Sequence, residues 1–238
     1  MLALKLGNSL SGLGKTGENI YSLAFNGTDE SVKIDSVGAD MRSTVGTISL
    51  WAKFNTVSAS GSMIQTRVDA NNLINLFYHA SSNEIRFAYK GGGTVKTVVL
   101  SAGSFEGDGK WHHIAATWST DADEIKLYVD GTLIGTTTGL GTFAGAIDEC
   151  YIGQNTQDGA FFNGNLCEVA VFTRVVPIAE LWIDKRQPIN FIGASGIVGY
   201  WKFDRGSGII ALDSTSYAND GELENTPTWS TDVPYKSN

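Results

Sequence analysis

Oxygen-bearing side chains gather in the turns of this chain, where they could hold a hard cation. Calcium binds several carboxylate, amide and carbonyl oxygens offered by flexible loops, so these side chains are candidate ligands of a structural calcium ion. Asn and Asp are also common turn residues whose side chains cap their own backbone, and that alternative stays open. The candidates are Asn26, Asp29 and Glu30 in one turn, Asp213, Asn219 and Asp220 in a second, and the neighbours Asp148 and Glu149.

A second chemistry to consider is glycoside hydrolysis, which needs two carboxyl groups about 5–10 Å apart across a cleft. Alternate residues of a strand reach the same face. Asp148 and Glu149 are adjacent, so on a strand they point to opposite faces. Asp121, Asp123 and Glu124 cluster in a hairpin loop, where solvated charges are expected. The carboxylates therefore predict no catalytic pair, and no catalytic residue is assigned.

The histidines offer no catalytic arrangement either. His112 and His113 are adjacent in a predicted strand, so their rings lie on opposite faces and cannot bind one metal together. His79 is the third and last histidine. No Ser or Cys has a nucleophile context such as G-x-S-x-G. We expect His112 and His113 to be core and interface residues.

Aromatic side chains could bind sugars, because lectin sites stack an exposed Trp or Tyr ring on the ligand. A sandwich core or a subunit contact would use the same residues, and both interpretations stay open. Trp229, Tyr78 and Tyr217 are the ones expected to be exposed. The residues expected in the core, from their strand patterns, are Trp51, Trp111, Trp118 and Trp201.

Two cysteines, Cys150 and Cys167, lie in predicted strands that a Gly-rich loop joins. That number gives no disulfide framework, and the spacing matches no zinc motif. A cross-strand disulfide and two small buried thiols are both compatible with this placement.

Short alternating strands must position all of these groups. The clearest pattern is a hairpin at 107–135, in which Asp130-Gly131 supplies the positive φ angles of a tight turn. Gly91-Gly92-Gly93 is a hairpin tip and not a phosphate cradle, since no helix follows it. One short helix near 177–186 is expected after Pro177. Further strands are predicted at 21–26, 31–35, 47–54, 62–68, 73–80, 84–90, 94–100 and 197–203, and in the segments AIDECYIG and NLCEVAVF. The fold class predicted is an all-β antiparallel sandwich.

Length and charge limit the function. At 238 residues the chain suits one sandwich domain, expected at 21–238 after an N-terminal arm at 1–20. The formal charge of −8 argues against a nucleic-acid partner, because phosphate binding needs a basic surface. No segment is apolar for long enough to span a bilayer, and the N-terminus lacks the apolar run of a signal peptide. The sequence thus predicts a protein that is made for the cytoplasm or leaves the cell by another route such as lysis, as a virion protein assembled in the host cytoplasm does.

Three blocks of sequence resemble a laminin G-like domain of the concanavalin A-like jelly-roll superfamily. They are SLAFNGTDESVKI, TISLWAKF with GKWHHIAATW and IKLYVDGTLIG, and FFNGNLCEVAVFTRVVPIAEL. The resemblance covers roughly 21–185 and implies the fold more strongly than a function, since the fold serves lectins, glycosidases, adhesion modules and virion proteins. The E-x-D-x-x-E strand of the superfamily's hydrolases is absent from the sequence.

Two departures from the family pattern stand out. Cys167 occupies a position where the family usually has an Asp of a calcium site, which puts the metal in doubt. The C-terminal segment 197–234 resembles the family's first strand and loop, so a circular permutation would let it complete the sandwich; a truncated second copy is the alternative. This arrangement is also similar to that of tailed-phage virion proteins.

The function expected is a non-catalytic structural and binding module on a virion surface, as a capsid decoration or tail component, with glycan adhesion. The alternative is a free carbohydrate-binding lectin, and a glycoside hydrolase ranks below both. Expected partners are other virion proteins or further copies of the chain, and cell-surface glycans. Neither a nucleic-acid partner nor membrane insertion is expected, and no cofactor is assigned beyond the calcium considered above.

Overall fold

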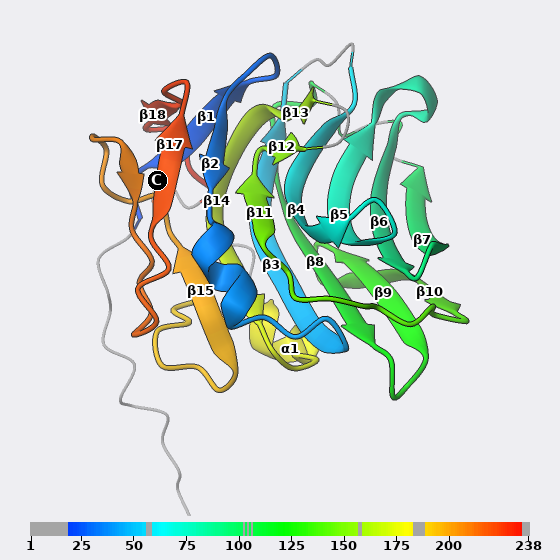
Figure 1. Cartoon of the computed structure of the whole chain (residues 1–238). Helices are drawn as coiled ribbons and strands as arrows, with labels where there is room; N and C mark the ends of the chain where they lie inside the picture. Colours follow the sequence, from blue (N-terminus) through cyan, green and yellow to red (C-terminus); the bar gives the residue numbers. More distant parts are fainter. Residues whose placement is uncertain are drawn as a thin grey trace, which may run out of the picture.

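Two antiparallel sheets pack face to face and make a sandwich (Figure 1). The computed structural model describes residues 19–234, apart from 56–58, 102, 104, 106, 157–158 and 183–188. The expected all-β sandwich is confirmed, and among the described residues the one α-helix is a single turn. No helix in the described part of the chain has the length and apolar character needed to cross a membrane.

The eight-stranded sheet has the order β10-β9-β8-β3-β14-β1-β18, with β15 paired to the second half of β14. Its strands are β1 (Ser22–Asn26), β3 (Val45–Phe54), β8 (Trp111–Ser119), β9 (Glu124–Val129), β10 (Thr132–Thr138), β14 (Asn163–Phe172), β15 (Ile197–Trp201) and β18 (Thr228–Ser230).

The ten-stranded sheet has the order β16-β17-β2-β11-β4-β5-β6-β7, and β12 and β13 lie beside β4. Its strands are β2 (Ser31–Lys33), β4 (Gly61–Asp69), β5 (Asn72–His79), β6 (Glu84–Gly91), β7 (Thr94–Ser101), β11 (Glu149–Ile152), β12 (Gln154–Asn155), β13 (Ala160–Phe161), β16 (Ile210–Ala211) and β17 (Gly221–Glu224). Short 3-10 turns occupy Asp35–Ala39 and Ala80–Ser82.

Period-two alternation decides which side chains enter the core between the sheets. On β8, Ile114 and Trp118 point into that core, whereas Ala115 packs on the outer face of the eight-stranded sheet. On β5, Ile74 and Leu76 point inward. A slip of one residue would exchange the two faces, so the apolar pattern fixes the register of each strand.

The hairpin at 107–135 is confirmed, and its second turn follows the sequence pattern. Val129 pairs with Thr132 across a two-residue turn in which Asp130 has φ 48° and Gly131 has φ 76°. Positive φ angles at both central residues are typical of a type I′ turn, whose twist matches the right-handed twist of the two flanking strands. The turn also brings Asp130 beside His112 and His113.

The C-terminal strands lie beside the N-terminal ones in both sheets, where Figure 1 shows orange and red strands against blue ones. In the eight-stranded sheet β18 pairs with β1, and β15 pairs with β14. In the ten-stranded sheet β17 pairs with β2. Residues 197–230 therefore contribute strands to each sheet.

The predicted helix at 177–186 is shorter in the structure. Helix α1 (Ile178–Leu181) starts after Pro177 and ends at Trp182, whose backbone is extended at φ −138° and ψ 98°. The extended backbone places the Trp182 ring 5.4 Å from the ring of Trp51, measured between centroids. The rest of the predicted helix, 183–186, lies outside the described residues.

The two cysteines do not pair, so the disulfide alternative is wrong. Cys150 lies on β11 of the ten-stranded sheet and faces the main core. Cys167 lies on β14 of the eight-stranded sheet and contributes to a cluster on the outer face. Opposite sheets hold the two thiols, and burial raises the pKa of each.

Candidate functional site

The aromatic residues expected to be exposed divide between surface and core. Tyr217 is 51% exposed, and Trp229 is half-buried with its indole N–H donating to the Gly208 carbonyl at 3.0 Å. Tyr78 was predicted to be exposed, and this is wrong, because it is 1% exposed and packs in the core. Since Ile74, Leu76 and Tyr78 alternate on one face of β5, the outward ring is that of Phe77.

The outer face of the ten-stranded sheet carries a row of polar and aromatic side chains. Register places Tyr151 of β11 opposite Gln65 of β4, and Gln65 opposite Asn75 of β5. Phe77 lies on the same face of β5, opposite Arg86 of β6. Opposite residues in a sheet lie about 5 Å apart, so these side chains form one contiguous surface, called here the Gln65 face.

Gln65 sits at the centre of that face with one side of its amide unused. The backbone N–H of Thr156 donates to Gln65 Oε1 at 3.2 Å, which fixes the orientation of the amide. Gln65 is 1% exposed, and its Nε2 has no hydrogen-bond partner among the described residues. A buried amide without a partner costs about 1–3 kcal/mol, so an acceptor brought by a ligand would recover that energy.

Two ion pairs flank the row. Arg67 Nε lies 3.2 Å from Glu149 Oε2, and Arg67 Nη1 donates to Thr156 Oγ1 at 3.0 Å. Arg86 Nε donates to Glu84 Oε2 at 2.7 Å. The segment after β11 thus ties Gln65, Arg67 and Glu149 together through Thr156, and these polar side chains can hydrogen-bond to hydroxyl groups.

A second group of side chains covers the outer face of the eight-stranded sheet. The Trp182 ring lies 5.3 Å from the imidazole of His113 between centroids, and Cys167 packs beneath the same rings. Ser49 Oγ lies 2.9 Å from His113 Nε2, and His113 Nδ1 has no hydrogen-bond partner among the described residues. Burial lowers the pKa of His113 to about 4, so this ring is neutral at pH 7.

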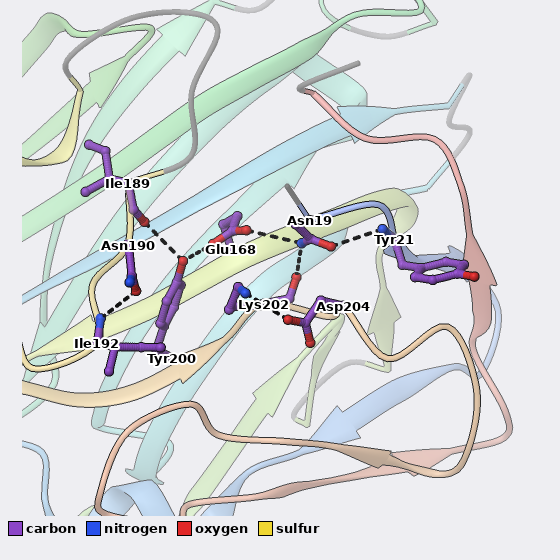
Figure 2. A network of polar contacts seen from close by, with 9 residues as sticks. All are labelled: Asn19, Tyr21, Glu168, Ile189, Asn190, Ile192, Tyr200, Lys202 and Asp204. Atoms are coloured by element: carbon purple, nitrogen blue, oxygen red, sulfur yellow. Dashed lines mark hydrogen bonds and ion pairs between the residues drawn. The ribbon is translucent and has the colours of Figure 1, made fainter. Parts of the chain in front are cut away.

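A buried carboxyl group lies farther along the same face. Glu168 has φ 53° at an irregularity in the pairing of β14, which turns its side chain toward Tyr200 of β15. Figure 2 shows Tyr200 between Glu168 and the Ile189 carbonyl, and Asn19 bonded to Glu168 Oε1 at 3.1 Å. Glu168 is 2% exposed, and burial raises its pKa to about 7.

The comparison with family models decides where the chain belongs. The model described as the concanavalin A-like lectin/glucanases superfamily matches residues 26–181. The chain belongs to this laminin G-like superfamily. No curated protein matches the chain.

Solved structures similar to this laminin G-like chain include carbohydrate-binding modules. A putative carbohydrate binding protein from Bacteroides ovatus aligns at TM-score 0.62 and 17% identity, over 93% of this chain and 63% of that one. The chain thus spans less than two thirds of that protein. The sialidase module CBM40 of Ruminococcus gnavus, solved with α2,3-sialyllactose, aligns at TM-score 0.54 and 16% identity, over 69% and 97%. Domain 4 of a Geobacillus stearothermophilus arabinanase, in complex with arabinotriose, aligns at TM-score 0.51 and 17% identity, over 67% and 74%.

The calcium candidates of the laminin G-like chain cap their own turns. Asn26 Oδ1 accepts from the Thr28 and Asp29 N–H groups, and Asn26 Nδ2 donates to Asp29 Oδ1 at 2.9 Å. Glu30 Oε2 accepts the N–H of Asn26 at 2.7 Å. Nowhere in the described ranges do three His, Cys, Asp or Glu side chains gather in a way that could hold a metal.

The C-terminal candidates form a second self-contained turn. Asp213 accepts the N–H groups of Tyr200, Thr215 and Asn219, each at 2.9 Å. Asp220 Oδ1 accepts the Asp213 N–H at 2.8 Å. These oxygens hold β15 against the turn at 213–220, so backbone capping accounts for them.

The other carboxylates considered from the sequence lie apart from one another. Asp123 caps the N–H groups of Gly139 and Leu140, and Glu124 pairs with Lys126. Asp121 and Asp148 are exposed, and Glu149 pairs with Arg67.

His112 and His113 point to opposite faces, as the sequence predicts. His112 Nδ1 lies 2.8 Å from Asp130 Oδ2, and its Nε2 lies 3.2 Å from Asp108 Oδ2. These two carboxylates outweigh burial and raise the pKa of His112. His79 contacts Ser82.

Among the aromatic residues expected in the core, Trp118 and Trp201 are confirmed there. Trp51 is buried, but on the outer face beneath Trp182. Trp111 was expected in the core and is half-buried on that same outer face, where its indole N–H donates to Asp232 Oδ1 at 3.1 Å. The expectation failed because Trp111 shares its strand face with His113, which is the outer face.

Sequence analysis missed Gln65, Tyr151 and Phe77. Each stands next to a core residue in an alternating strand, and that alternation is the signal that could have found them. The N-terminal arm expected at 1–20 lies outside the described residues except for Asn19 and Ile20. Asn19 Nδ2 donates to the Lys202 carbonyl at 2.6 Å, so the same domain holds it.

Proposed function

We propose that this chain is a carbohydrate-binding module whose ligand lies on the Gln65 face. The observation that carries the proposal is the buried Nε2 of Gln65, which has no hydrogen-bond partner among the residues that the structure describes and lies between Tyr151 and Asn75. A sugar hydroxyl would accept that N–H, and the Tyr151 ring would stack on the sugar. The similarity to modules solved with sialyllactose and arabinotriose supports the class of ligand.

The test is a glycan array followed by titration calorimetry on a bound oligosaccharide. Tyr151→Ala and Gln65→Leu should each weaken binding at least about tenfold, because each removes one direct contact. Tyr217→Ala is the matched control, since Tyr217 is exposed away from the Gln65 face, and it should bind as the wild type does. Wild-type affinity in both Tyr151→Ala and Gln65→Leu would reject the site.

We further propose that the module is non-catalytic. The two carboxylates beside the arginines of the Gln65 face are engaged, Glu149 with Arg67 and Glu84 with Arg86. Hydrolysis would need one carboxyl group free to protonate the leaving oxygen and a second to face it. Incubation with any bound oligosaccharide should release no shorter product, as measured by chromatography.

We also propose that the module acts on a virion surface, as a capsid decoration or tail component. The alternative is a free lectin. The C-terminal arrangement that resembles tailed-phage proteins supports the virion placement, and glycan binding is compatible with either. Mass spectrometry of purified particles from the source would test it. Absence of the chain from such particles would favour the free lectin.

A further inference from the structure

We infer that the Gln65 face binds uncharged sugars in preference to acidic ones, an inference that rests on the proposed function. An acidic sugar is recognised by arginine through paired, charge-assisted hydrogen bonds to its carboxylate. Each arginine of this face already lies within ion-pair distance of a carboxylate, whose negative charge an acidic ligand would meet.

Both arginines lie within ion-pair distance of a carboxylate of the same sheet, although Arg67 Nε has no hydrogen-bond partner among the described residues. Arg67 lies against Glu149 at 3.2 Å, and Arg86 Nη2 lies 2.6 Å from Glu84 Oε2. An anionic ligand at either arginine would come within a few ångströms of Glu149 or Glu84. Like charges at such distances repel each other, and this repulsion offsets the attraction of the arginine.

The other charged side chains of the Gln65 face do not reverse the preference for an uncharged sugar. Lys33 pairs with Asp35 at 3.2 Å, and Glu222 and Glu224 flank it on β17. Lys90 has no carboxylate partner among the described residues, and it lies opposite the apolar Leu73 and Val95, away from Gln65.

A neutral sugar meets no such conflict. Its hydroxyl oxygens accept from Gln65 Nε2, and its hydroxyl protons can be donated to Glu149 without breaking the Arg67 pair, since a carboxylate accepts several hydrogen bonds. The preference therefore follows from the ion pairs that surround Gln65.

Matched pairs of neutral and sialylated oligosaccharides, titrated into the full chain, test the inference. The wild type should bind the neutral member about tenfold more tightly or better. Glu149→Gln should narrow that difference, because it removes the repelling charge and frees Arg67. Tighter binding of the sialylated member by the wild type would overturn this inference alone, whereas no binding of any glycan would overturn the proposed function and this inference with it.

A separate observation, independent of glycan binding, concerns the Glu168 network. We propose that protonation of Glu168 stabilises the packing of the segment around Ile189 against the eight-stranded sheet. Tyr200 has one hydroxyl proton and two acceptors in reach, Glu168 Oε2 and the Ile189 carbonyl at 3.1 Å (Figure 2).

The number of protons decides which bonds form. When Glu168 is protonated, its O–H donates to Tyr200 Oη, and Tyr200 is free to donate to Ile189. When Glu168 is ionised, Tyr200 must donate to the carboxylate, and the Ile189 carbonyl loses its donor. Asn19 donates to Glu168 Oε1 and to the Lys202 carbonyl in both states.

The surroundings place this change in the neutral pH range. The charged pair nearest to Glu168 is Lys202 with Asp204, whose Nζ and Oδ2 lie 2.8 Å apart. Cys167 and Tyr200 are the other titratable neighbours, and burial keeps both protonated. The covering residues 189–192 carry no ionisable side chain. With these neighbours, the pKa of Glu168 lies at about 7.

Hydrogen exchange of the full chain between pH 5 and pH 8.5, corrected for the intrinsic exchange rate, tests the proposal. Protection of the amides at 191–197 should fall about tenfold from low to high pH in the wild type. Glu168→Gln should keep high protection throughout, since its amide donates to Tyr200 at every pH, and Tyr200→Phe should show low protection throughout. Protection that does not change with pH in the folded wild type would overturn the proposal.

Discussion

Gly131 lies directly against the indole of Trp182. A Cβ atom at Gly131 would come within 2.4 Å of Trp182 Cδ1, so the tip of the β9–β10 hairpin leaves room for that ring only because it has no side chain. Trp182 in turn covers Trp51 and His113. Gly131 thus permits both the tight turn and the packing of Trp182 on the outer face of the sheet.

Gly131→Ala should lower the free energy of unfolding by roughly 2–4 kcal/mol, through backbone strain at φ 76° and the clash with Trp182. Urea unfolding and the tryptophan emission maximum measure the two effects. Gly109→Ala is the matched control, because Gly109 has φ 72° and nothing within 4 Å of its added Cβ. Equal losses in the two variants would show that Trp182 does not depend on Gly131.

His113 should make the stability of the domain depend on pH. Its folded pKa of about 4 lies below the ordinary value of 6.5. As pH falls from 6.5 to 4, the unfolded chain gains a proton that the folded chain does not, so the wild type loses roughly 3 kcal/mol relative to His113→Phe. Above pH 6.5 the difference between the two proteins should be constant.

Urea unfolding of both proteins at several pH values measures that difference and cancels the contribution of other groups. Glu168 acts in the opposite sense, because its folded pKa is raised: its stabilisation is complete below pH 4.5 and is lost as pH rises toward 7. A pH-independent difference between wild type and His113→Phe would mean that the imidazole is not buried as described.

Phe77 and Tyr78 should respond to truncation in different ways. Tyr78→Ala should destabilise the fold by roughly 3–5 kcal/mol, because it empties part of the main core. Phe77→Ala removes a half-buried ring from the Gln65 face, so it should cost little stability and reduce glycan affinity. Thermal unfolding together with glycan titration measures the two effects, and the reverse order of stability losses would contradict the register of β5.

Calcium should leave the melting temperature unchanged within about 1 °C, whether the ion is added or chelated. The turn at 213–220 depends on Asp213 itself, so Asp213→Asn should cost roughly 2–4 kcal/mol by facing an amide N–H₂ toward backbone donors. The exposed Asp148 provides the control variant, Asp148→Asn. A melting temperature that rises clearly with calcium would support the calcium site considered from the sequence.

The fold was largely predictable from sequence because it depends on alternation and turn chemistry. Ile114 and Trp118 in β8, and the Asp130-Gly131 turn, are local signals that the structure bears out. The faces of Trp51 and Trp111 were harder to predict, because a segment far along the chain buries the outer face of the sheet. Nothing in the strand pattern of 47–54 shows that Trp182 will cover it.

The candidate site was less predictable, because it depends on register between strands that are distant in sequence. Gln65 and Tyr151 meet only when β11 pairs with β4, and Thr156 orients Gln65 only through that pairing. The Glu168 network joins Asn19, Tyr200 and Ile189, which no local pattern relates. Turn-borne acids were conspicuous in the sequence, and the structure uses them as caps.

The pairing of β18 with β1 and of β17 with β2 has a consequence during synthesis. Strands β1 and β2 are synthesised about two hundred residues before β18 and β17, each of which covers one edge of its partner. The other neighbours of β1 and β2, strands β14 and β11, also follow much later. Until then both early strands expose unpaired edges, and pairing across so long a loop is slow. We therefore expect the nascent chain to need protection from aggregation until β17 and β18 have been synthesised.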